Sequence, residues 1–294
     1  MFKNMNLGVK YMLFASFTFA LMGAFAKLAS EEISSLEVVF FRNLFGVLII
    51  SYTIYKSGIR SKGGKPWLLL FRGTMGFLAL LTYFYNIAHI SLGDAVTYSK
   101  TAPIFTALFA WLFLSEKIDK SAWIALFLGF LGIVFIAEPS GSGGFSKYDL
   151  LGIFSGVGAA LAYTSIRELR NYYDTNVIVL SFVLVGTIGP LILFGIAEFY
   201  TIDELDFMLS TFVLPSGIVW LYVVGLGVLG TISQYYMTKS YAVAKAGVVG
   251  AVSYTNILFA IIVGVALGDD LPSLLTTVGI ALVVFAGILV AREK

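Results

Sequence analysis

The chain has 294 residues, of which 59% are hydrophobic and 12% are charged, and its formal net charge is +2. A soluble domain would carry about twice that share of charged residues, so the composition predicts an integral membrane protein. Cysteine is absent and His89 is the single histidine, which excludes disulfides, thiolate chemistry and a metal site built from His and Cys.

Ten apolar segments follow one another along the chain, and each is roughly 17–25 residues long, enough to cross the hydrocarbon core as a helix. The sequence therefore predicts an all-α integral membrane protein with ten transmembrane helices. The expected spans are residues 7–29, 36–55, 66–88, 94–114, 121–137, 148–167, 177–197, 214–238, 246–267 and 272–291.

Basic and acidic residues alternate between successive connections. Basic residues precede the first span, fill every second connection and end the chain, as at Lys65, Lys120 and Arg170, whereas the connections between them are acidic, as at Asp206 and Asp269. Only Lys27 and Lys147 break the pattern. Because Lys and Arg concentrate on the cytoplasmic side, both termini are expected in the cytoplasm and the protein in a bacterial-type inner membrane.

Two parts of the chain resemble each other. The segment Leu114–Ile118, which closes the fourth span, matches Leu267–Leu271, which closes the ninth, and Pro103 lines up with Asn256. We therefore expect two repeats of five helices, residues 1–144 and 145–294. Since five is odd, the second repeat would enter from the opposite side, and such inverted repeats suit alternating access to one site between them.

A set of short motifs, weak singly but specific in their order and spacing, resembles the EamA family of the drug/metabolite transporter superfamily along nearly the whole chain. They are Ser35–Arg42, Arg72–Gly76, Tyr83–Asn86, Ser91–Ala95, Ala102–Phe105 and Leu114–Glu116. The resemblance implies a transporter whose central cavity is lined mainly by the first, third, fourth, sixth, eighth and ninth spans. Members are proposed to carry amino acids, S-adenosylmethionine, riboflavin or other metabolites, so the family does not name the cargo.

Three cations lie within apolar spans, and no Asp or Glu accompanies them there. Charged groups inside a membrane are costly and usually mark a pathway or a site. Lys100 is expected either to contact cargo or to be held by the Ser99 carbonyl, which Pro103 frees, or by an acid at the rim. Arg42 is expected to have a gating or structural role, and Arg72 to extend its stem to the headgroups.

Uncharged polar and aromatic residues on the cavity spans complete the candidate binding site. They are Tyr83, Asn86, Tyr98, Tyr163, Gln234, Tyr235, Tyr254 and Asn256. Together with unpaired cations, they predict a cargo that bears a carboxylate or phosphate or is zwitterionic. Because no span carries the carboxylate that proton-coupled pumps typically use, facilitated diffusion or exchange is favoured over multidrug-cation antiport.

One alternative is a flippase for lipids or lipid-linked intermediates, or an accessory subunit, in which Arg42 and Lys100 meet a lipid phosphate. An enzyme is not expected, since no nucleophile, base and orienting group can be assembled within the spans. No cofactor, metal or nucleic-acid partner is expected. The sequence leaves open the direction of transport and whether the protein is a monomer or a homodimer.

Overall fold

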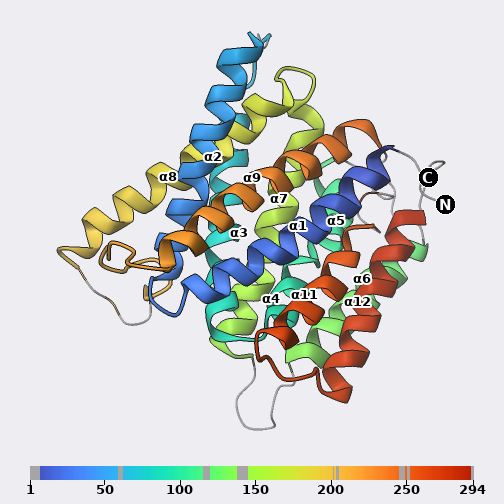
Figure 1. Cartoon of the computed structure of the whole chain (residues 1–294). Helices are drawn as coiled ribbons and strands as arrows, with labels where there is room; N and C mark the ends of the chain where they lie inside the picture. Colours follow the sequence, from blue (N-terminus) through green and yellow to red (C-terminus); the bar gives the residue numbers. More distant parts are fainter. Residues whose placement is uncertain are drawn as a thin grey trace.

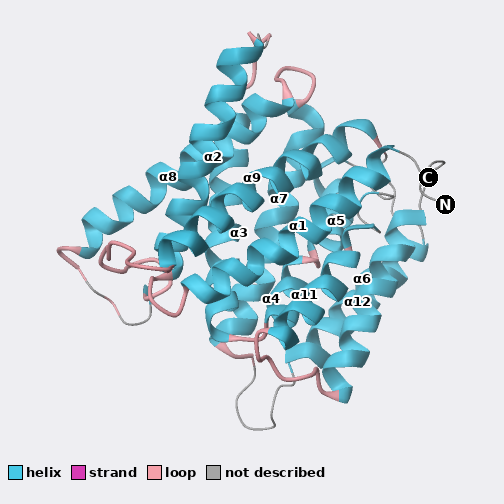
Figure 2. Ribbon diagram, viewed as in Figure 1, coloured by secondary structure: helices cyan, strands magenta, loops and turns pink. Residues whose placement is uncertain are grey.

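The computed structural model describes residues 7–58, 62–114, 120–137, 145–200, 202, 205–244, 249 and 252–292, and within them the regular structure is helical, without a strand (Figure 2). Its helices pack into one bundle (Figure 1). They are α1 (Leu7–Ala29), α2 (Ser35–Ser57), α3 (Pro66–His89), α4 (Leu92–Ser99), α5 (Ala102–Leu114), α6 (Lys120–Ala137), α7 (Lys147–Leu169), α8 (Thr175–Ala197), α9 (Val219–Val243), α11 (Thr255–Ala266) and α12 (Leu274–Arg292).

Among the described helices, six are long and apolar enough to cross a membrane: α1, α2, α3, α7, α8 and α9. Shorter apolar helices occupy Phe127–Ile136, Thr255–Ala266 and Leu274–Ala286. Large apolar side chains such as Phe127 and Ile262 are exposed on the outside of the bundle, where lipid would cover them. The membrane-protein class is therefore confirmed.

The expected fourth span is not one helix. α4 ends at Ser99, Lys100 is its C-cap, and α5 begins at Ala102. Pro103 is the second residue of α5, and a proline is tolerated in a first turn because its missing N–H would have no helical partner there. The expectation of a continuous helix over 94–114 is wrong, since the chain separates into two helices instead of kinking.

The expected ninth span is also only partly one helix. α11 covers its second half, from Thr255 to Ala266, while residues 245–248, 250 and 251 lie outside the described part. The repeat motif at residues 115–118 lies outside it too. α5 and α11 begin at residues 102 and 255, which are 153 apart, the same separation as that of Pro103 and Asn256.

Each principal helix pairing has a counterpart when the two halves of the chain are exchanged. α1 packs along α9 as α3 packs along α7, α2 contacts α9 as α8 contacts α3, and α1 contacts α11 as α7 contacts α5. α2 also contacts α8, and α6 contacts α12; each of these pairs joins helices at matching places in the two halves, so exchanging the halves leaves the pair unchanged. In Figure 1, α6 and α12 lie together at one side of the bundle. There the backbones are close, since a Cβ added at Gly132 would lie 2.8 Å from the Gly279 carbonyl oxygen.

Connections with acidic residues meet at one end of the bundle, which we call the acidic end. Lys27, at the last turn of α1, forms an ion pair with Asp269, which follows α11. The second oxygen of the same carboxylate accepts a hydrogen bond from the Leu92 N–H at 3.0 Å, where α4 begins. One carboxylate thus ties α1 and α4 to the connection between α11 and α12.

A second carboxylate closes the same end from the connection between α8 and α9. Asp206 pairs with Lys147 at the start of α7 and accepts a hydrogen bond from the Tyr85 hydroxyl at 2.7 Å. Partial burial opposes ionisation of Asp206, but the bonds from Lys147 and Tyr85 outweigh it and lower its pKa. The two lysines that broke the charge pattern of the sequence are therefore both paired with acids.

At the opposite end, which we call the basic end, the described ion pair is exposed. Lys65 and Glu168 are 2.8 Å apart, and their side chains are 43% and 45% exposed. The Glu168 pair raises the pKa of Lys65. Exposed ion pairs contribute little to stability, so this contact holds the two connections together less firmly than the less exposed Lys27–Asp269 pair of the acidic end.

Candidate functional site

A cavity lies in the middle of the bundle, and its empty volume is about 650 Å³ with the open mouth included. Side chains from α1, α2, α3, α4, α7, α8, α9 and α11 line it. No Asp or Glu of the described residues is among them.

Two arginines share one aromatic ring in this cavity. The guanidinium carbons of Arg42, on α2, and Arg72, on α3, lie 4.9 and 4.8 Å from the centroid of Phe182, on α8. Both arginines are 1% exposed, and neither forms an ion pair with a described acid. The face of an aromatic ring attracts a cation, so Phe182 compensates part of the cost of burying these two charges.

The two arginines differ in their hydrogen bonds. Arg42 donates to the Asn43 side chain at 2.8 Å, to the Gly230 carbonyl at 3.2 Å and to Gln234 at 3.5 Å, which joins α2 to α9. This geometry fits the structural role expected of Arg42, although its buried Nε has no hydrogen-bond partner in the part of the chain that the structure describes. Arg72 forms no hydrogen bond with any described residue, and its Nε is likewise unpartnered.

The expectation that Arg72 reaches the headgroups is wrong. Its side chain is 1% exposed and lines the cavity with Phe182 and Gly76. Gly76 makes room for it, because a Cβ at that position would lie 2.4 Å from an Arg72 terminal nitrogen. Arg72 therefore points inward because the helix neighbours leave space there, which a count of residues from the membrane boundary does not reveal.

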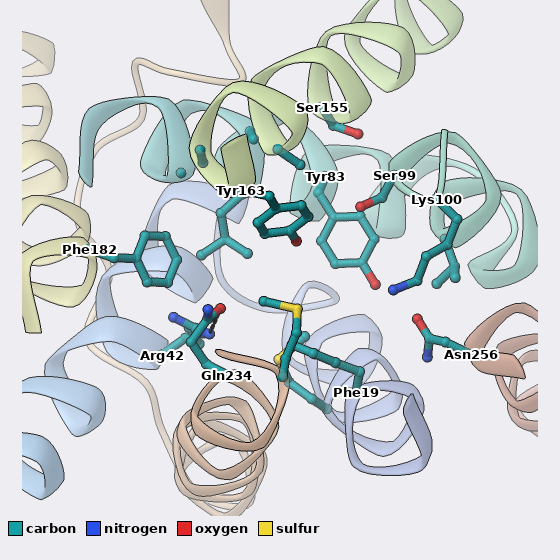
Figure 3. A pocket seen from close by; sticks show the side chains of 18 of the residues that line it. Phe19, Arg42, Tyr83, Ser99, Lys100, Ser155, Tyr163, Phe182, Gln234 and Asn256 are labelled. Atoms are coloured by element: carbon teal, nitrogen blue, oxygen red, sulfur yellow. Dashed lines mark hydrogen bonds between the residues drawn. The ribbon is translucent and has the colours of Figure 1, made fainter. Parts of the chain in front are cut away.

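Lys100 lies at the junction of α4 and α5 and points into the cavity (Figure 3). Its ammonium nitrogen is 5.7 Å from the centroid of Phe19, and it forms no hydrogen bond or ion pair with a described residue. The expected alternative, in which a rim acid or the Ser99 carbonyl holds it, has no support among these contacts. The nearby Asn256 side chain donates to the Ser16 carbonyl at 2.8 Å.

The structure brings several of the expected site residues around this one cavity and leaves others outside. Those that line it are Lys100, Tyr83, Tyr163, Gln234, Asn256, Arg42 and Arg72. The tyrosines come from α3 and α7, Gln234 from α9 and Asn256 from the first turn of α11. Residues from both halves of the chain therefore meet at the cavity.

Four expected residues do not line the cavity. Asn86 donates to the Tyr148 carbonyl at 2.9 Å, and the Tyr98 hydroxyl donates to Asp149 at 2.6 Å, so both hold the start of α7 at the acidic end. Tyr254, at the N-cap of α11, is 3% exposed, and its hydroxyl has no hydrogen-bond partner among the described residues. Tyr235 packs edge-on against Tyr236.

Buried acids in the described residues lie at helix starts rather than in the cavity. Glu37 and Asp149 are the third residues of α2 and α7, and each completes a capping box with the serine before its helix, Ser34 or Ser146. Glu37 also accepts from the Val213 N–H at 2.7 Å. Backbone N–H groups thus balance these carboxylates, which leaves the cavity cations without them.

Sequence reasoning missed the apolar part of the lining, which includes Phe19, Met22, Phe182 and Met237. The resemblance did not place the second and seventh spans at the cavity, yet α2 supplies Arg42 and α8 supplies Phe182. An apolar residue within an apolar helix carries no sequence signal for a site. Only the packing of α8 against α2 and α3 puts Phe182 there.

Comparison with known proteins places the chain in a family. Residues 6–137 match the model of the EamA-like transporter family. An uncharacterized transporter of Helicobacter pylori is 34% identical over 290 residues, with 97% of this chain and 94% of that protein covered. The chain belongs to the EamA-like transporter family. It is thus a multi-pass membrane protein and a transporter, not an enzyme, as its sequence predicted.

Other relatives extend the comparison. The pseudopaline exporter CntI of Pseudomonas aeruginosa is 35% identical, with 98% of this chain and 96% of that protein covered. Human solute carrier family 35 member G1 is 28% identical, with 98% and 80% covered. A solved crystal structure superimposes with a TM-score of 0.64 at 17% identity and covers 97% of this chain and 96% of its own, so it shares the fold.

Proposed function

We propose that this protein is a secondary transporter of the inner membrane that moves a small organic metabolite by alternating access. The cargo bears a carboxylate or a phosphate or is zwitterionic. One observation carries the proposal: Arg42, Arg72 and Lys100 face a single buried cavity, and none of them is paired with a described acid.

The free energy of burying charge explains why these cations indicate the cargo. A charged group in a low-dielectric interior is costly unless a counter-charge or hydrogen bonds compensate it. Arg42 has such bonds, but the interactions that Arg72 and Lys100 form with described residues are cation–π contacts with Phe182 and Phe19. An anionic group on the cargo supplies the missing compensation, whereas a purely cationic cargo would add to the repulsion.

Alternating access requires two units that can move against each other. Support for two inverted repeats, 1–144 and 145–294, comes from the helix pairings that recur when the halves are exchanged, and from the matching starts of α5 and α11. On this reading the six long helices, α6, α12 and the two interrupted segments make ten spans. The cavity lies where the repeats meet, as in transporters built this way.

Charge distribution supports a cytoplasmic location for the basic end and for both termini. The acidic end then faces outward, and the contacts of Asp269 and Asp206 tie its helices together. The relatives' names, pseudopaline exporter and riboflavin transporter, differ in cargo, so neither cargo is assigned to this chain.

Counterflow in liposomes tests the proposal. The purified protein is loaded with amino acids, nucleotides, S-adenosylmethionine or phosphorylated metabolites in turn, and Lys100→Met is compared with wild type. Lys239→Met is the matched control, because Lys239 also lies over aromatic rings, at 5.0 Å from Tyr11 and 5.5 Å from Tyr235, but not at the cavity.

We expect saturable exchange of an anionic or zwitterionic compound that Lys100→Met weakens and Lys239→Met does not. Exchange of purely cationic compounds, with anions inactive, would contradict the assigned cargo class. Transfer of labelled phospholipid in place of any soluble metabolite would favour the flippase.

A further inference from the structure

We infer that the cargo carries two anionic groups, one for each of two cationic poles of the cavity. The inference deepens the proposed function and rests on it, since it takes the cavity as the cargo's site. In Figure 3, Arg42 and Phe182 lie at one side of the cavity, Lys100 and Asn256 lie at the other, and Tyr83 and Tyr163 lie between them.

The arginine pole offers more donors than the protein uses. The terminal nitrogens of Arg42 donate hydrogen bonds to Asn43, Gly230 and Gln234. Arg72 donates to no described residue. A guanidinium has five N–H donors and binds a carboxylate or phosphate through two parallel bonds. Because two like charges share the Phe182 ring, an anion held by Arg72 also lowers the repulsion between them.

The lysine pole is a second, separate donor group. The Lys100 ammonium has three N–H donors and no acceptor among the described residues. Asn256 donates one amide N–H to the Ser16 carbonyl, and its side-chain oxygen, an acceptor, lies on the side of Lys100 in Figure 3, so the anion-binding donor of this pole is the Lys100 ammonium. Lys100 is the C-cap of α4 and lies two residues before the start of α5, and Asn256 lies in the first turn of α11. The positive ends of α5 and α11 therefore lie near this pole, together with the negative end of α4.

One small anion cannot satisfy both poles. The rings of Tyr83 and Tyr163 lie between them in Figure 3, and Met22 and Val96 also line the cavity. A cargo with one charged group would therefore leave the other pole uncompensated in a low-dielectric space. The lining fits a molecule with an apolar or aromatic middle and an acidic group at each end.

The test compares ligands that differ by one charge. Succinate, glutarate, adipate and pimelate are titrated against purified protein in nanodiscs, each beside its monomethyl ester, and binding is followed by calorimetry and thermal shift. We expect one chain length to bind best, and its monoester to bind about tenfold more weakly, as for the loss of one charge-assisted hydrogen bond. This wild-type comparison decides the question even where a variant fails to fold.

Two variants assign the poles. Lys100→Met and Arg72→Gln should each reduce the ratio of diacid to monoester affinity to about one, because each variant keeps a single pole. Lys239→Met should keep the wild-type ratio. Equal binding of diacid and monoester at every length, or an unchanged ratio in Lys100→Met, would overturn the inference.

The outcomes separate this inference from the proposed function. Counterflow of monocarboxylates with no preference for diacids would keep the transporter and refute the two poles. Selective binding of diacids without exchange of any of them would keep the poles and refute the transport mechanism.

Discussion

Replacing Asp269 with Asn should open the acidic end. The Asp269 carboxylate pairs with Lys27 and accepts the Leu92 N–H, and the Lys27 and Asp269 side chains are only 24% and 12% exposed. Asparagine keeps an acceptor for Leu92 but removes the charge. A charge-assisted hydrogen bond contributes about 1.5–3 kcal/mol, and about 1.4 kcal/mol changes an equilibrium tenfold, so the ratio of open to closed protein should rise at least about tenfold.

A single cavity cysteine can report this change, because the chain has no cysteine of its own. Ser155, on α7, lines the cavity and is 1% exposed, so Ser155→Cys should react with a membrane-impermeant maleimide applied at the acidic end only when that end opens. The labelling rate in Asp269→Asn, measured from each side of the membrane in turn, should exceed the wild-type rate at least about tenfold from the acidic side.

The neighbouring Asp270 gives a matched control. It is exposed and forms none of the ion pairs found among the described residues, so Asp270→Asn removes the same charge without removing a closing contact. Lys27→Met and Asp269→Asn each remove the same ion pair. The labelling rate of the double variant should therefore not exceed that of the faster single variant. Equal labelling rates in Asp269→Asn, Asp270→Asn and wild type would refute the role of Asp269 as a closing contact.

Two further predictions concern pH and packing. The pKa of Asp206 is lowered while Lys147 and Tyr85 bond it, so this contact is present above the ordinary aspartate value of about 4 and is lost as the pH falls through the lowered value. Acidification lowers the thiolate fraction and so slows labelling of the cavity cysteine in both proteins, but the ratio of the wild-type rate to the Asp206→Asn rate should rise as the contact is lost. An unchanged ratio would assign any effect on opening to another group. Gly132→Ala should lower the unfolding free energy by about 1–3 kcal/mol in thermal unfolding, since its methyl group would meet backbone of the facing helix at 2.8 Å. At Gly195 nothing lies within 4 Å of an added Cβ, so Gly195→Ala should leave stability unchanged or raise it, and an equal loss in both variants would contradict the close packing.

Helix positions were largely predictable because hydropathy and length are local properties. The first span, expected at 7–29, is observed at Leu7–Ala29, and the fifth, expected at 121–137, at Lys120–Ala137. The break in the fourth span was not predictable, because a proline in an apolar run can either kink a helix or begin a new one. Which of these occurs depends on the packing of α4 against α11 and of α5 against α7, and those contacts join residues far apart in the chain.

The site was predictable in its charges and not in its contacts. The sequence alone determined that Arg42, Arg72 and Lys100 lie in apolar spans without acids, since charge and hydropathy are read directly from residue types. Only the tertiary structure decided that Arg72 points inward and that Phe182 lies against both arginines. The direction of a side chain and its neighbours depend on how distant helices pack, and an apolar helix has the same composition whether it faces lipid or the cavity.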